Sequence, residues 1–272
     1  MRHGRPLPPL AALGLLLLAA VAPPAGAGGG DRVALDGTRL SVLRGDGTRL
    51  GPEQLPGSEL ELANRFTRYR LRVDAVERDP RDPSGETWLY ALSVQDPESG
   101  GWGQLCNPDP EGRRLAVPIP GSFAQDGRYV PDATRLTLTC TSGAAGKCVR
   151  FGYKPWGTAP DGTPLTDLYR ACVRMVRADY CGDGRSYTRD GTMIEVEDAF
   201  GILADGGLPS PTRRFEAAWG PEGATCVDHV RVPARGTLED VLRACPRLAG
   251  RLGQACTPAR PDPAGALLTN RS

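Results

Sequence analysis

The sequence predicts an α+β fold built mostly of short antiparallel strands with two helices and cross-linked by disulfides. Alternating apolar and polar residues fill the first half of the chain, and two segments with helical periodicity follow in the second half. Eight cysteines lie between residues 106 and 256. The 272 residues include 35 glycines and 26 prolines, a content that indicates many turns between short elements.

The first 27 residues have the pattern of a removable export signal. A positively charged start precedes an apolar run over residues 10–21, and residues 25–27 (Ala-Gly-Ala) supply the small-x-small pattern that signal peptidase requires. The run is shorter than the roughly 20 residues of a membrane-spanning helix. No later segment is apolar enough to span a membrane, so we expect no membrane insertion and a mature protein that is secreted or periplasmic.

Three further segments follow the predicted signal. Residues 28–58 form a Gly-rich leader in which Asp-Gly-Thr-Arg-Leu occurs at 36–40 and again at 46–50. Because Asp-Gly is a strong turn signal, this leader is predicted to be a small hairpin or a loose segment. A cysteine-rich domain is expected over residues 59–256, and the Pro/Ala-rich residues 257–272 are predicted to be disordered.

Strands are predicted where apolar and polar residues alternate. Apolar side chains alternate with arginines and an aspartate over residues 69–75, and a second alternating set covers 88–94. The Pro/Gly-rich connection between them, residues 79–85, favours an antiparallel pair. Residues 115–117 and 136–140 are predicted to be further short strands.

Two helices and one more strand are predicted in the second half of the chain. The first helix is predicted to begin near Thr163, which can cap it, with Pro164 at the first helical position and a stop at Gly182. An apolar stripe at helical spacing runs along this segment, with arginines on the opposite face. A strand is predicted over residues 192–197, and a second helix is predicted to begin after a Thr237 cap.

The eight cysteines are predicted to form four disulfides, because an even number in an exported chain is typical of a disulfide framework. Zinc is the alternative, but structural zinc sites favour cysteines two to four residues apart, and these cysteines are more widely spaced. The pairing stays open, with local pairs such as Cys140–Cys148 favoured because a short loop closes easily. The candidates are Cys106, Cys140, Cys148, Cys172, Cys181, Cys226, Cys245 and Cys256.

Composition excludes several classes of function. The 33 basic and 32 acidic residues nearly balance, so the chain lacks the positive charge of a bulk nucleic-acid binder, and we expect no nucleic-acid partner. The predicted mature chain has one histidine, His229, which excludes a histidine-rich metal site. No phosphate loop, dinucleotide fingerprint, Gly-x-Ser-x-Gly elbow or His-Glu-x-x-His motif occurs in the sequence.

The surroundings of His229 offer one catalytic hypothesis. His229 follows Asp228 and comes three residues after Cys226, so a base and a nucleophile could lie side by side. The alternative is that Cys226 forms a disulfide and that His229 only flanks a loop or a strand.

A cluster of acidic residues offers two more hypotheses. Several oxygen ligands close together could bind calcium, although the EF-hand spacing is absent. Paired carboxylates could also catalyse glycoside hydrolysis. The alternative is that these are solvated loop charges and turn-forming aspartates. The cluster comprises Asp179, Asp183, Asp190, Glu195, Glu197 and Asp198.

Residues 147–189 combine basic and aromatic side chains. Aromatic rings beside arginines could form a platform for a sugar or an anionic envelope polymer. The alternative is the hydrophobic centre of a disulfide-bonded domain, covered by the aliphatic stems of the arginines. The basic residues are Lys147, Arg150, Lys154, Arg170, Arg174, Arg177, Arg185 and Arg189, and the aromatic residues are Phe151, Tyr153, Trp156, Tyr169, Tyr180 and Tyr187.

Two long motifs occupy the middle of the chain. One is CVRFGYKPW at residues 148–156, and the other is ACVRMVRADYCGDGRSYTRDGT at residues 171–192. Together they resemble the bacterial ADYC domain family, named for the Ala-Asp-Tyr-Cys tetrapeptide at residues 178–181, and the resemblance is strongest over residues 136–200. The resemblance implies an exported, cysteine-rich bacterial protein, and it supplies no activity, cofactor or catalytic residue.

These observations predict a non-catalytic extracellular binding or structural module. Its ligand is unknown, with an extracellular polysaccharide as one class of partner. A secreted hydrolase that acts on an envelope or extracellular polymer is the alternative, and it would use the acidic cluster or Cys226 and His229. We assign no catalytic, cofactor-binding or metal-binding residue and expect no cofactor, calcium being the one that we consider.

Overall fold

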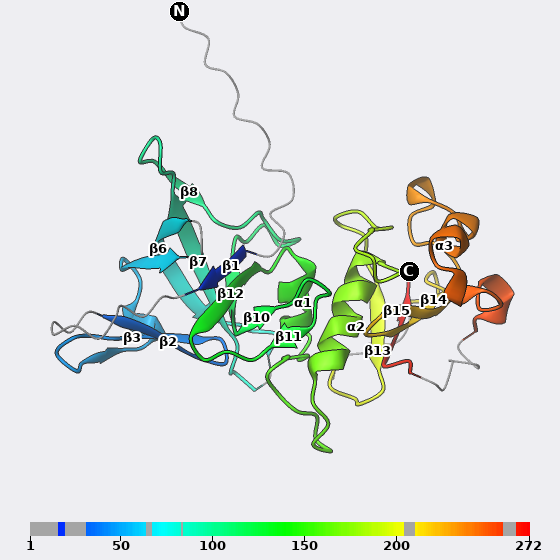
Figure 1. Ribbon diagram of the computed structural model, residues 1–272, viewed down its shortest axis with the longest axis horizontal. Helices are drawn as coiled ribbons and strands as arrows, with labels where there is room; N and C mark the ends of the chain where they lie inside the picture. The colour runs from blue at the N-terminus through cyan, green and yellow to red at the C-terminus, as the bar shows by residue number, and fades with distance from the viewer. Residues whose placement is uncertain (1–15, 20–30, 64–66, 83, 204–209, 258–264) are drawn as a thin grey trace, which may run out of the picture.

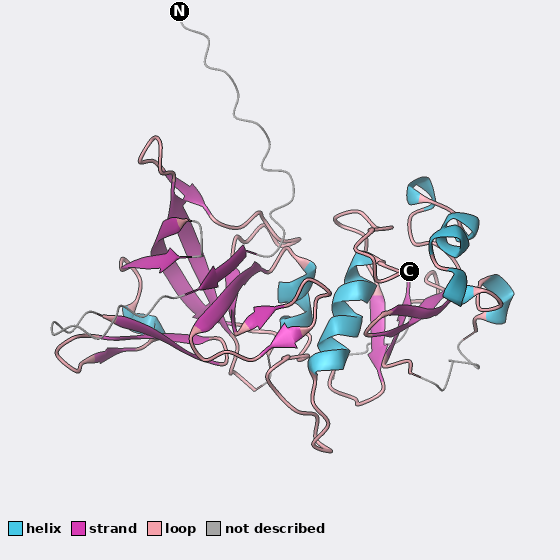
Figure 2. Cartoon of the chain, viewed as in Figure 1, coloured by secondary structure: helices cyan, strands magenta, loops and turns pink. Residues whose placement is uncertain are grey.

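The computed structural model describes residues 16–19, 31–63, 67–82, 84–203, 210–257 and 265–272. Most of the regular structure in these ranges is antiparallel strand, joined by loops and three α-helices (Figure 2). With the disulfides given below, this arrangement confirms the predicted α+β class. The helices are α1 (Ala144–Arg150), α2 (Thr166–Arg177) and α3 (Leu238–Ala244), with short 3-10 helices at η1 (Pro52–Gln54), η2 (Pro233–Arg235), η3 (Pro246–Leu248) and η4 (Gly253–Ala255).

The described part of the chain forms two lobes with the helices α1 and α2 between them (Figure 1). We call residues 31–141, with β1, the N-terminal lobe and residues 166–272 the C-terminal lobe. The strands of the N-terminal lobe are β1 (Leu16–Ala19), β2 (Arg32–Asp36), β3 (Arg39–Leu43), β4 (Arg49–Leu50), β5 (Glu59–Ala63), β6 (Arg68–Arg78), β7 (Trp88–Gln95), β8 (Trp102–Gln104), β9 (Ala116–Pro120), β10 (Ser122–Phe123), β11 (Tyr129–Val130) and β12 (Arg135–Cys140). The strands of the C-terminal lobe are β13 (Glu195–Asp198), β14 (Phe215–Gly220), β15 (Gly223–Val227) and β16 (Leu268–Arg271).

A closed antiparallel sheet forms the N-terminal lobe. Its strands follow the order β6-β5-β1-β12-β9-β7-β8, and an additional pairing between β6 and β7 closes the ring. The alternation along β6 places Leu71 and Val73 inside the ring, where they are 1% and 0% exposed, and leaves Arg70 outside. Tyr90 and Leu92 of β7 fill the same interior. The strands predicted over 69–75, 88–94 and 136–140 are therefore present as β6, β7 and β12.

The small sheet β2-β3-β4 covers part of this interior. A hairpin joins β2 to β3 at the first Asp-Gly sequence, where Asp36 pairs with Arg39. Leu40 and Val42 of β3 are buried in the same core as the closed sheet, and the Leu40 N–H donates to Tyr90 Oη at 2.8 Å. Of the two expectations for the leader, the hairpin is correct for the residues that the structure describes.

Helix α1 was not predicted from the sequence. It has seven residues and contains a glycine, so its intrinsic preference for helix is weak. Gly146 is required there, because a Cβ atom would lie 2.3 Å from the Cys140 carbonyl oxygen. The close approach seats α1 directly on the end of β12, and α1 in turn packs against α2.

Helix α2 is present, but both of its predicted ends are wrong. It begins at Thr166 rather than near Thr163, because residues 158–164 form a loop that a Thr158–Pro164 bridge closes. It ends at Arg177, before the predicted stop at Gly182. Helix α3 begins as predicted, since Thr237 caps it and exchanges hydrogen bonds with Asp240.

The sheet of the C-terminal lobe has the order β13-β16-β14-β15, and α2 packs against it. The predicted disorder of residues 257–272 is wrong for residues 268–271, which form β16 between β13 and β14. Leu268 and Asn270 of this strand are 2% and 1% exposed. The composition of residues 257–272 is dominated by proline and alanine and does not indicate a strand. Only the last residues of this tail pair with β13 and β14. Residues 258–264 lie outside the described part.

Four disulfides use all eight cysteines, as predicted. The favoured Cys140–Cys148 pair is wrong. Cys140 at the end of β12 turns toward the segment after β8, whereas Cys148 on α1 faces α2. Proximity in sequence does not decide the pairing, because β12 and α1 present their cysteines to different cores. The disulfides are Cys106–Cys140, Cys148–Cys172, Cys181–Cys245 and Cys226–Cys256.

Strand β1 lies inside the segment that is predicted to be an export signal. Its backbone pairs with β12 over residues 16–19 and with β5 at Ala63. The rest of the predicted signal lies outside the described residues, so its boundaries stay a prediction. Within the described ranges, no helix is both long and apolar enough to cross a membrane.

Candidate functional site

The Ala-Asp-Tyr-Cys tetrapeptide directly follows α2, and each of its residues has a distinct structural role. Ala178 adopts the left-handed conformation, with φ of 49°. Its N–H donates to the Met175 carbonyl, and the Asp179 N–H donates to the Arg174 carbonyl, a pattern that terminates a helix and reverses the chain. Glycine usually holds this position, and alanine costs roughly 1 kcal/mol more there. The Ala178 methyl group is fully buried in the core, which offsets part of this cost.

Asp179 is fully buried and holds the loop that follows the tetrapeptide. Its Oδ2 accepts a hydrogen bond from Arg174 Nη1 at 2.6 Å and another from the Gly184 N–H at 3.0 Å. The same carboxylate oxygen therefore pairs with an arginine of α2 and fixes the turn at Gly184. It faces the protein interior and not a solvent-filled cleft.

Tyr180 joins α2 to the sheet of the C-terminal lobe. Its hydroxyl donates to Glu216 Oε1 at 2.9 Å and accepts from the Arg231 N–H at 2.9 Å. Its ring stacks on Trp219, with 5.3 Å between the ring centroids. Burial, with the Glu216 charge beside it, raises the pKa of Tyr180 far above its usual range, so the hydroxyl remains a donor.

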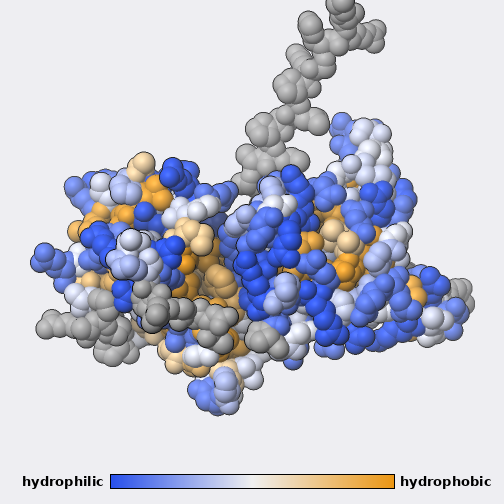
Figure 3. All heavy atoms as spheres, turned by 180° about the vertical axis from the view of Figure 1, so that it is seen from behind, coloured by the Kyte–Doolittle hydropathy of each residue, from blue (hydrophilic) through white to orange (hydrophobic). Residues whose placement is uncertain are grey.

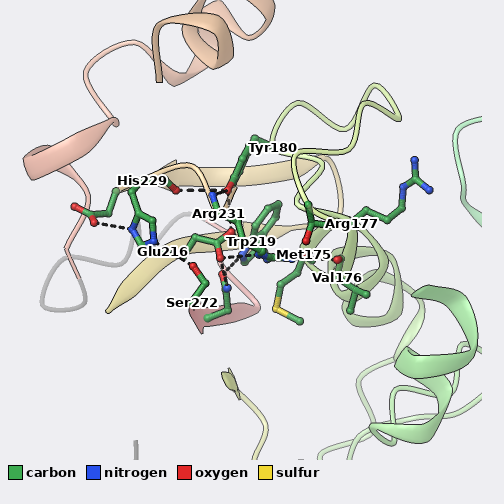
Figure 4. A network of polar contacts seen from close by, with 12 residues as sticks. Met175, Val176, Arg177, Tyr180, Glu216, Trp219, His229, Arg231 and Ser272 are labelled. Carbon is green, nitrogen blue, oxygen red and sulfur yellow. Dashed lines mark hydrogen bonds and ion pairs between the residues drawn. The ribbon is translucent and has the colours of Figure 1, made fainter. Parts of the chain in front are cut away.

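An enclosed ion pair, Arg231–Glu216, lies at the centre of this lobe (Figure 4). Arg231 Nε and Nη2 donate to the two carboxylate oxygens at 2.8 and 3.0 Å, and both side chains are at most 1% exposed. Asn270 Nδ2 donates to Glu216 Oε2 at 2.7 Å, and Trp219 Nε1 donates to Asn270 Oδ1 at 2.8 Å.

The other end of Arg231 reaches the end of α2. Its Nη1 and Nη2 donate to the Val176 and Met175 carbonyls at 3.0 and 2.8 Å. The guanidinium thus donates to two carbonyls of the last helical turn, of which that of Met175 also accepts from the Ala178 N–H. Its positive charge lies at the negative end of the helix dipole, which is a favourable interaction. Glu216 receives donors from Arg231, Tyr180 and Asn270, so its carboxylate has no position left for a substrate. We interpret this network as structural.

The model of the ADYC domain matches residues 52–233, which is more than half of the chain. This protein belongs to the ADYC domain family. Comparison with curated proteins and with solved structures gave no match.

The family's tetrapeptide therefore builds the junction between α2 and the C-terminal sheet in this ADYC domain. Cys181 completes the junction through its disulfide to Cys245, which attaches α3. All four residues act through burial, hydrogen bonding or a covalent bond. The matched range ends at residue 233, before α3 and β16, although β16 lies in the middle of the C-terminal sheet.

The Cys226–His229 hypothesis is wrong, because Cys226 is bonded to Cys256 and has no thiol. The structure instead places His229 between two oxygens. His229 Nδ1 lies 3.0 Å from Asp228 Oδ2, and Nε2 lies 3.1 Å from Ser272 Oγ (Figure 4). A carboxylate, an imidazole and a hydroxyl in this order are the parts of a nucleophilic catalytic triad. Sequence reasoning missed Ser272, because it is 43 residues from His229.

The surroundings of Ser272 do not complete such a triad. Its N–H donates to the Arg214 carbonyl at 3.1 Å, and the Arg214 N–H donates to the Ser272 carbonyl at 3.3 Å. Acyl transfer requires free backbone or side-chain donors beside the nucleophile, where the oxyanion develops. The backbone N–H groups of Ser272 and Arg214 thus already have carbonyl partners, so they are not free to stabilise an oxyanion beside the Ser272 hydroxyl.

The acidic cluster is dispersed, and its members have different partners. Asp179 is in the ion pair described above, and Asp183 accepts from the Arg185 N–H in a turn. Glu195 pairs with Arg213 at 2.7 Å. Asp198 accepts from three backbone N–H groups, of Phe200, Ile202 and Leu203, and from Tyr153 Oη. Among the described residues, no group of three or more His, Cys, Asp or Glu is placed to hold a metal ion.

The aromatic residues of 147–189 are mostly inside the molecule. Four tyrosines from this stretch are at most 2% exposed and belong to the core shared by α1, α2 and the C-terminal sheet. The platform hypothesis is therefore wrong for these rings, and the hydrophobic-centre alternative is confirmed. They are Tyr153, Tyr169, Tyr180 and Tyr187.

A small hollow lies at the start of α2. It has a volume of about 220 Å³ and is lined by Pro164, Asp167, Phe200 and Leu267 among others. Pockets for small-molecule ligands usually occupy about 300–1,000 Å³. The volume of this hollow is below that range.

A polar surface with one tryptophan covers the outside of β6, β7 and β8. Cross-strand pairing arranges its side chains in two adjacent rows. In one row Arg70 Nη1 donates to Gln95 Oε1 at 2.8 Å, and Gln95 pairs with Trp102 across the strands. We call this set the outer β6–β8 surface. Its members are Arg70, Arg72, Asp74, Ser93, Gln95, Trp102 and Gln104.

The second row is a continuous polar network. Ser93 Oγ donates to Asp74 Oδ2 at 2.5 Å, and Arg72 Nε donates to Asp74 Oδ1 at 2.7 Å. Burial opposes the ionisation of Asp74, but these hydrogen bonds outweigh it and hold its pKa below the usual range. The Arg72 guanidinium lies over the Trp102 ring, 4.9 Å from its centroid.

The sequence pointed to residues 147–189 as a possible platform and did not single out the outer β6–β8 surface. The arginines at 70 and 72 were visible as the outward half of an alternating strand. The missing information was the pairing of β8 with β7, which brings Trp102 beside them. Hydrophilic side chains cover much of the N-terminal lobe and surround smaller hydrophobic patches (Figure 3).

Proposed function

We propose that this ADYC domain protein is an exported, non-catalytic module that binds an extracellular polysaccharide through the outer β6–β8 surface. The observation that carries the proposal is the pair of polar rows beside Trp102. Sugar hydroxyls require fixed donors and acceptors, and the apolar face of a sugar ring packs on an aromatic ring. Amide and guanidinium groups and the partly exposed Asp74 carboxylate stand next to one indole ring on this surface, while the buried Ser93 hydroxyl holds Asp74 in place.

The rigidity of the surface supports the proposal. Its side chains project from the paired strands β6, β7 and β8 and are held by hydrogen bonds to one another. Fixed side chains lose little entropy on binding, which favours recognition of a flexible polymer. The absence of a free thiol among the cysteines and the four disulfides fit an oxidising compartment, in agreement with the predicted export signal.

Titration of the purified, oxidised protein with soluble fragments of neutral and acidic bacterial polysaccharides tests this function. We expect saturable binding to one class and a loss of about tenfold or more in affinity for Trp102→Ala, because a buried aromatic contact is worth on the order of 1–3 kcal/mol. Arg185→Ala is the matched control, since Arg185 also lies over an aromatic ring, Tyr187, but on the other lobe. Unchanged binding by Trp102→Ala would exclude this surface.

A second candidate function is ester or amide hydrolysis at Asp228, His229 and Ser272. The hydrogen-bonded order of these three side chains favours it. The incomplete oxyanion environment is the reason that we place it second. Turnover of an activated ester that both Ser272→Ala and His229→Gln abolish, with polysaccharide binding unaffected, would bring this function to the front.

A further inference from the structure

The closed sheet depends on β1, which lies in the predicted export signal. β1 stands between β5 and β12, pairing with β12 at four positions and with β5 at one. The other neighbours of these two strands are β6 and β9. Cleavage after residue 27 would remove β1 and leave β5 and β12 facing each other across a gap one strand wide.

The edge of β12 presents its backbone groups to this gap. Pro118 and Pro120 of β9 have no N–H groups, and they stand opposite Leu138 and Leu136. The hydrogen-bonded pairs between β9 and β12 must therefore fall at the alternate residues, such as Thr137. In an antiparallel strand alternate residues bond to opposite neighbours, so the N–H and C=O groups of Leu136 and Leu138 point into the gap.

The edge of β5 presents backbone groups from the other side. Ala63 pairs with residue 19 of β1, so alternation places the backbone groups of Glu61 on the same edge. The interior floor of the gap is apolar, because Leu60 and Leu62 of β5 are 8% and 2% exposed in the core of the closed sheet. Leu136 and Leu138 of β12 belong to that core as well.

Two facing edges above an apolar floor are an unstable arrangement in water. Unpaired edges attract other strands, and folded proteins normally cover them. Direct pairing of β5 with β12 would require the two strands to approach by about 4.8 Å, the spacing of neighbouring strands. The pairings β5–β6, β6–β7 and β9–β12 and the Cys106–Cys140 disulfide oppose that movement.

We propose that the mature protein binds an extended segment of a partner polypeptide between β5 and β12, by addition of a strand. The segment has apolar residues at alternate positions, which face Leu60, Leu62, Leu136 and Leu138. The outward residues beside Glu61 are polar, because Glu61 is exposed, whereas those beside Thr137 meet a buried surface, since Thr137 is 0% exposed. β1 itself shows that an antiparallel strand of at least four residues fits against β12. The proposal rests on the export that the proposed function assumes, and it is independent of polysaccharide binding.

The test uses the exported protein with its disulfides intact and a fluorescent peptide of residues 14–21 (GLLLLAAV) with two lysines at each end for solubility. We expect saturable binding and slower hydrogen exchange at the Leu136 and Leu138 amides when the peptide is bound. A peptide with proline at the positions of Leu16 and Leu18 is the matched control, since it loses two ladder hydrogen bonds. Its affinity should be lower by about tenfold or more.

A protein form that retains residues 1–27 provides the second control. Ala25→Arg disrupts the small-x-small cleavage pattern, and the uncleaved protein should not bind the peptide because β1 occupies the gap. Three results overturn the proposal: amides of Leu136 and Leu138 that are already protected in the peptide-free mature protein, equal binding of the proline peptide, or a dimer of the mature protein that fills the gap.

An intact mass that includes residues 1–27 would overturn the export prediction together with this inference. A cleaved protein with a closed sheet would overturn the inference alone and leave the proposed function standing.

Discussion

The two lobes of this protein are stabilised by different interactions. The N-terminal lobe encloses an aliphatic and aromatic core, with residues such as Leu71, Val73 and Leu92 inside a closed sheet. The C-terminal lobe has a four-stranded sheet, with the buried pair Arg231–Glu216 at the centre of the lobe. Two disulfides lie within the C-terminal lobe and one within the N-terminal lobe, and the fourth joins α1 to α2.

The difference lies in what the two cores enclose. The core beside the C-terminal sheet is also strongly apolar, with Trp219 and Tyr187 fully buried, but it surrounds a charged pair. A buried polar network stabilises only while every buried group has a partner. We therefore expect the C-terminal lobe to be the more sensitive to loss of single partners, and the N-terminal lobe to loss of volume.

The largest effect should come from Arg231→Met. This change leaves the Glu216 carboxylate buried without its counter-ion and removes two hydrogen bonds from the end of α2. Breaking a buried ion pair on one side typically costs about 3–5 kcal/mol of the free energy of unfolding. Chemical denaturation measures the loss, and hydrogen exchange should locate it in α2, β14 and β16.

Arg68→Met is the matched control in the N-terminal lobe. Arg68 pairs with Glu61, but the two side chains are 82% and 57% exposed. Water screens such pairs, so no measurable change is expected. Equal losses for the two variants would contradict the view that the buried network stabilises the C-terminal lobe.

Removing one disulfide from each lobe tests the comparison, because the two disulfides close loops of similar length. Cys226 and Cys256 are 30 residues apart, and Cys106 and Cys140 are 34 apart. Chain entropy alone predicts a similar loss, roughly 3.5 kcal/mol, when either pair is changed to alanine. If the C-terminal lobe depends more on cross-links, the Cys226→Ala and Cys256→Ala double variant will lose more and will expose β15 and β16 to exchange.

Loss of volume in the closed sheet should come next in size. Leu92 is 2% exposed and faces the interior beside Val73. Leu92→Ala should lower the free energy of unfolding by about 3 kcal/mol, because it removes buried apolar area and leaves a cavity. A loss confined to exchange in β6 and β7 would support separate lobes, whereas an equal increase of exchange in β14 would show that they unfold as one unit.

The parts of this fold that the sequence predicts are those with strong local patterns. β6, β7 and β12 follow from alternation, and the start of α3 follows from the Thr237 cap. Helix α1 was missed because seven residues with a glycine carry little local signal. β16 was missed because a four-residue strand acquires its stability from β13 and β14, which are distant in the sequence.

The candidate sites were predicted less well, because they depend on contacts between distant segments. The Asp228–His229 part of the possible triad was visible, but Ser272 reaches it only through the pairing of β16. In the sequence alone, the aromatic residues of 147–189 stand beside basic residues and resemble a binding platform. The packing of α1 and α2 against the C-terminal sheet buries four of their rings.

The smallest effect concerns the loop between β6 and β7, which contacts the segment after α1. Asp82 accepts hydrogen bonds from the Thr87 N–H at 2.8 Å and from Lys154 Nζ at 3.3 Å, and Lys154 lies just after α1. Burial alone would raise the pKa of Asp82, but hydrogen bonds from Ser84 and Thr87 and the charge of Lys154 lower it well below the usual value. We expect Asp82→Asn to reduce the free energy of unfolding at pH 7 by about 1 kcal/mol, as is typical for a hydrogen-bonded pair.

The pH dependence of this effect distinguishes charge from shape. A folded-state pKa below the unfolded value of 3.8 stabilises the protein above that value, and the stabilisation is lost as the pH falls through the folded pKa. The difference between the wild type and Asp82→Asn should stay constant from pH 7 to about 5 and shrink below 3.8. Asp96, in an exposed turn of the N-terminal lobe, also has a lowered pKa, because it accepts hydrogen bonds from the Ser99 and Glu98 backbone. Asp96→Asn therefore measures the pH dependence of a turn carboxylate alone, without the charge of Lys154. A difference that stays the same down to pH 2 would mean that the Asp82 charge does not contribute to stability, and that only its hydrogen-bonding shape matters.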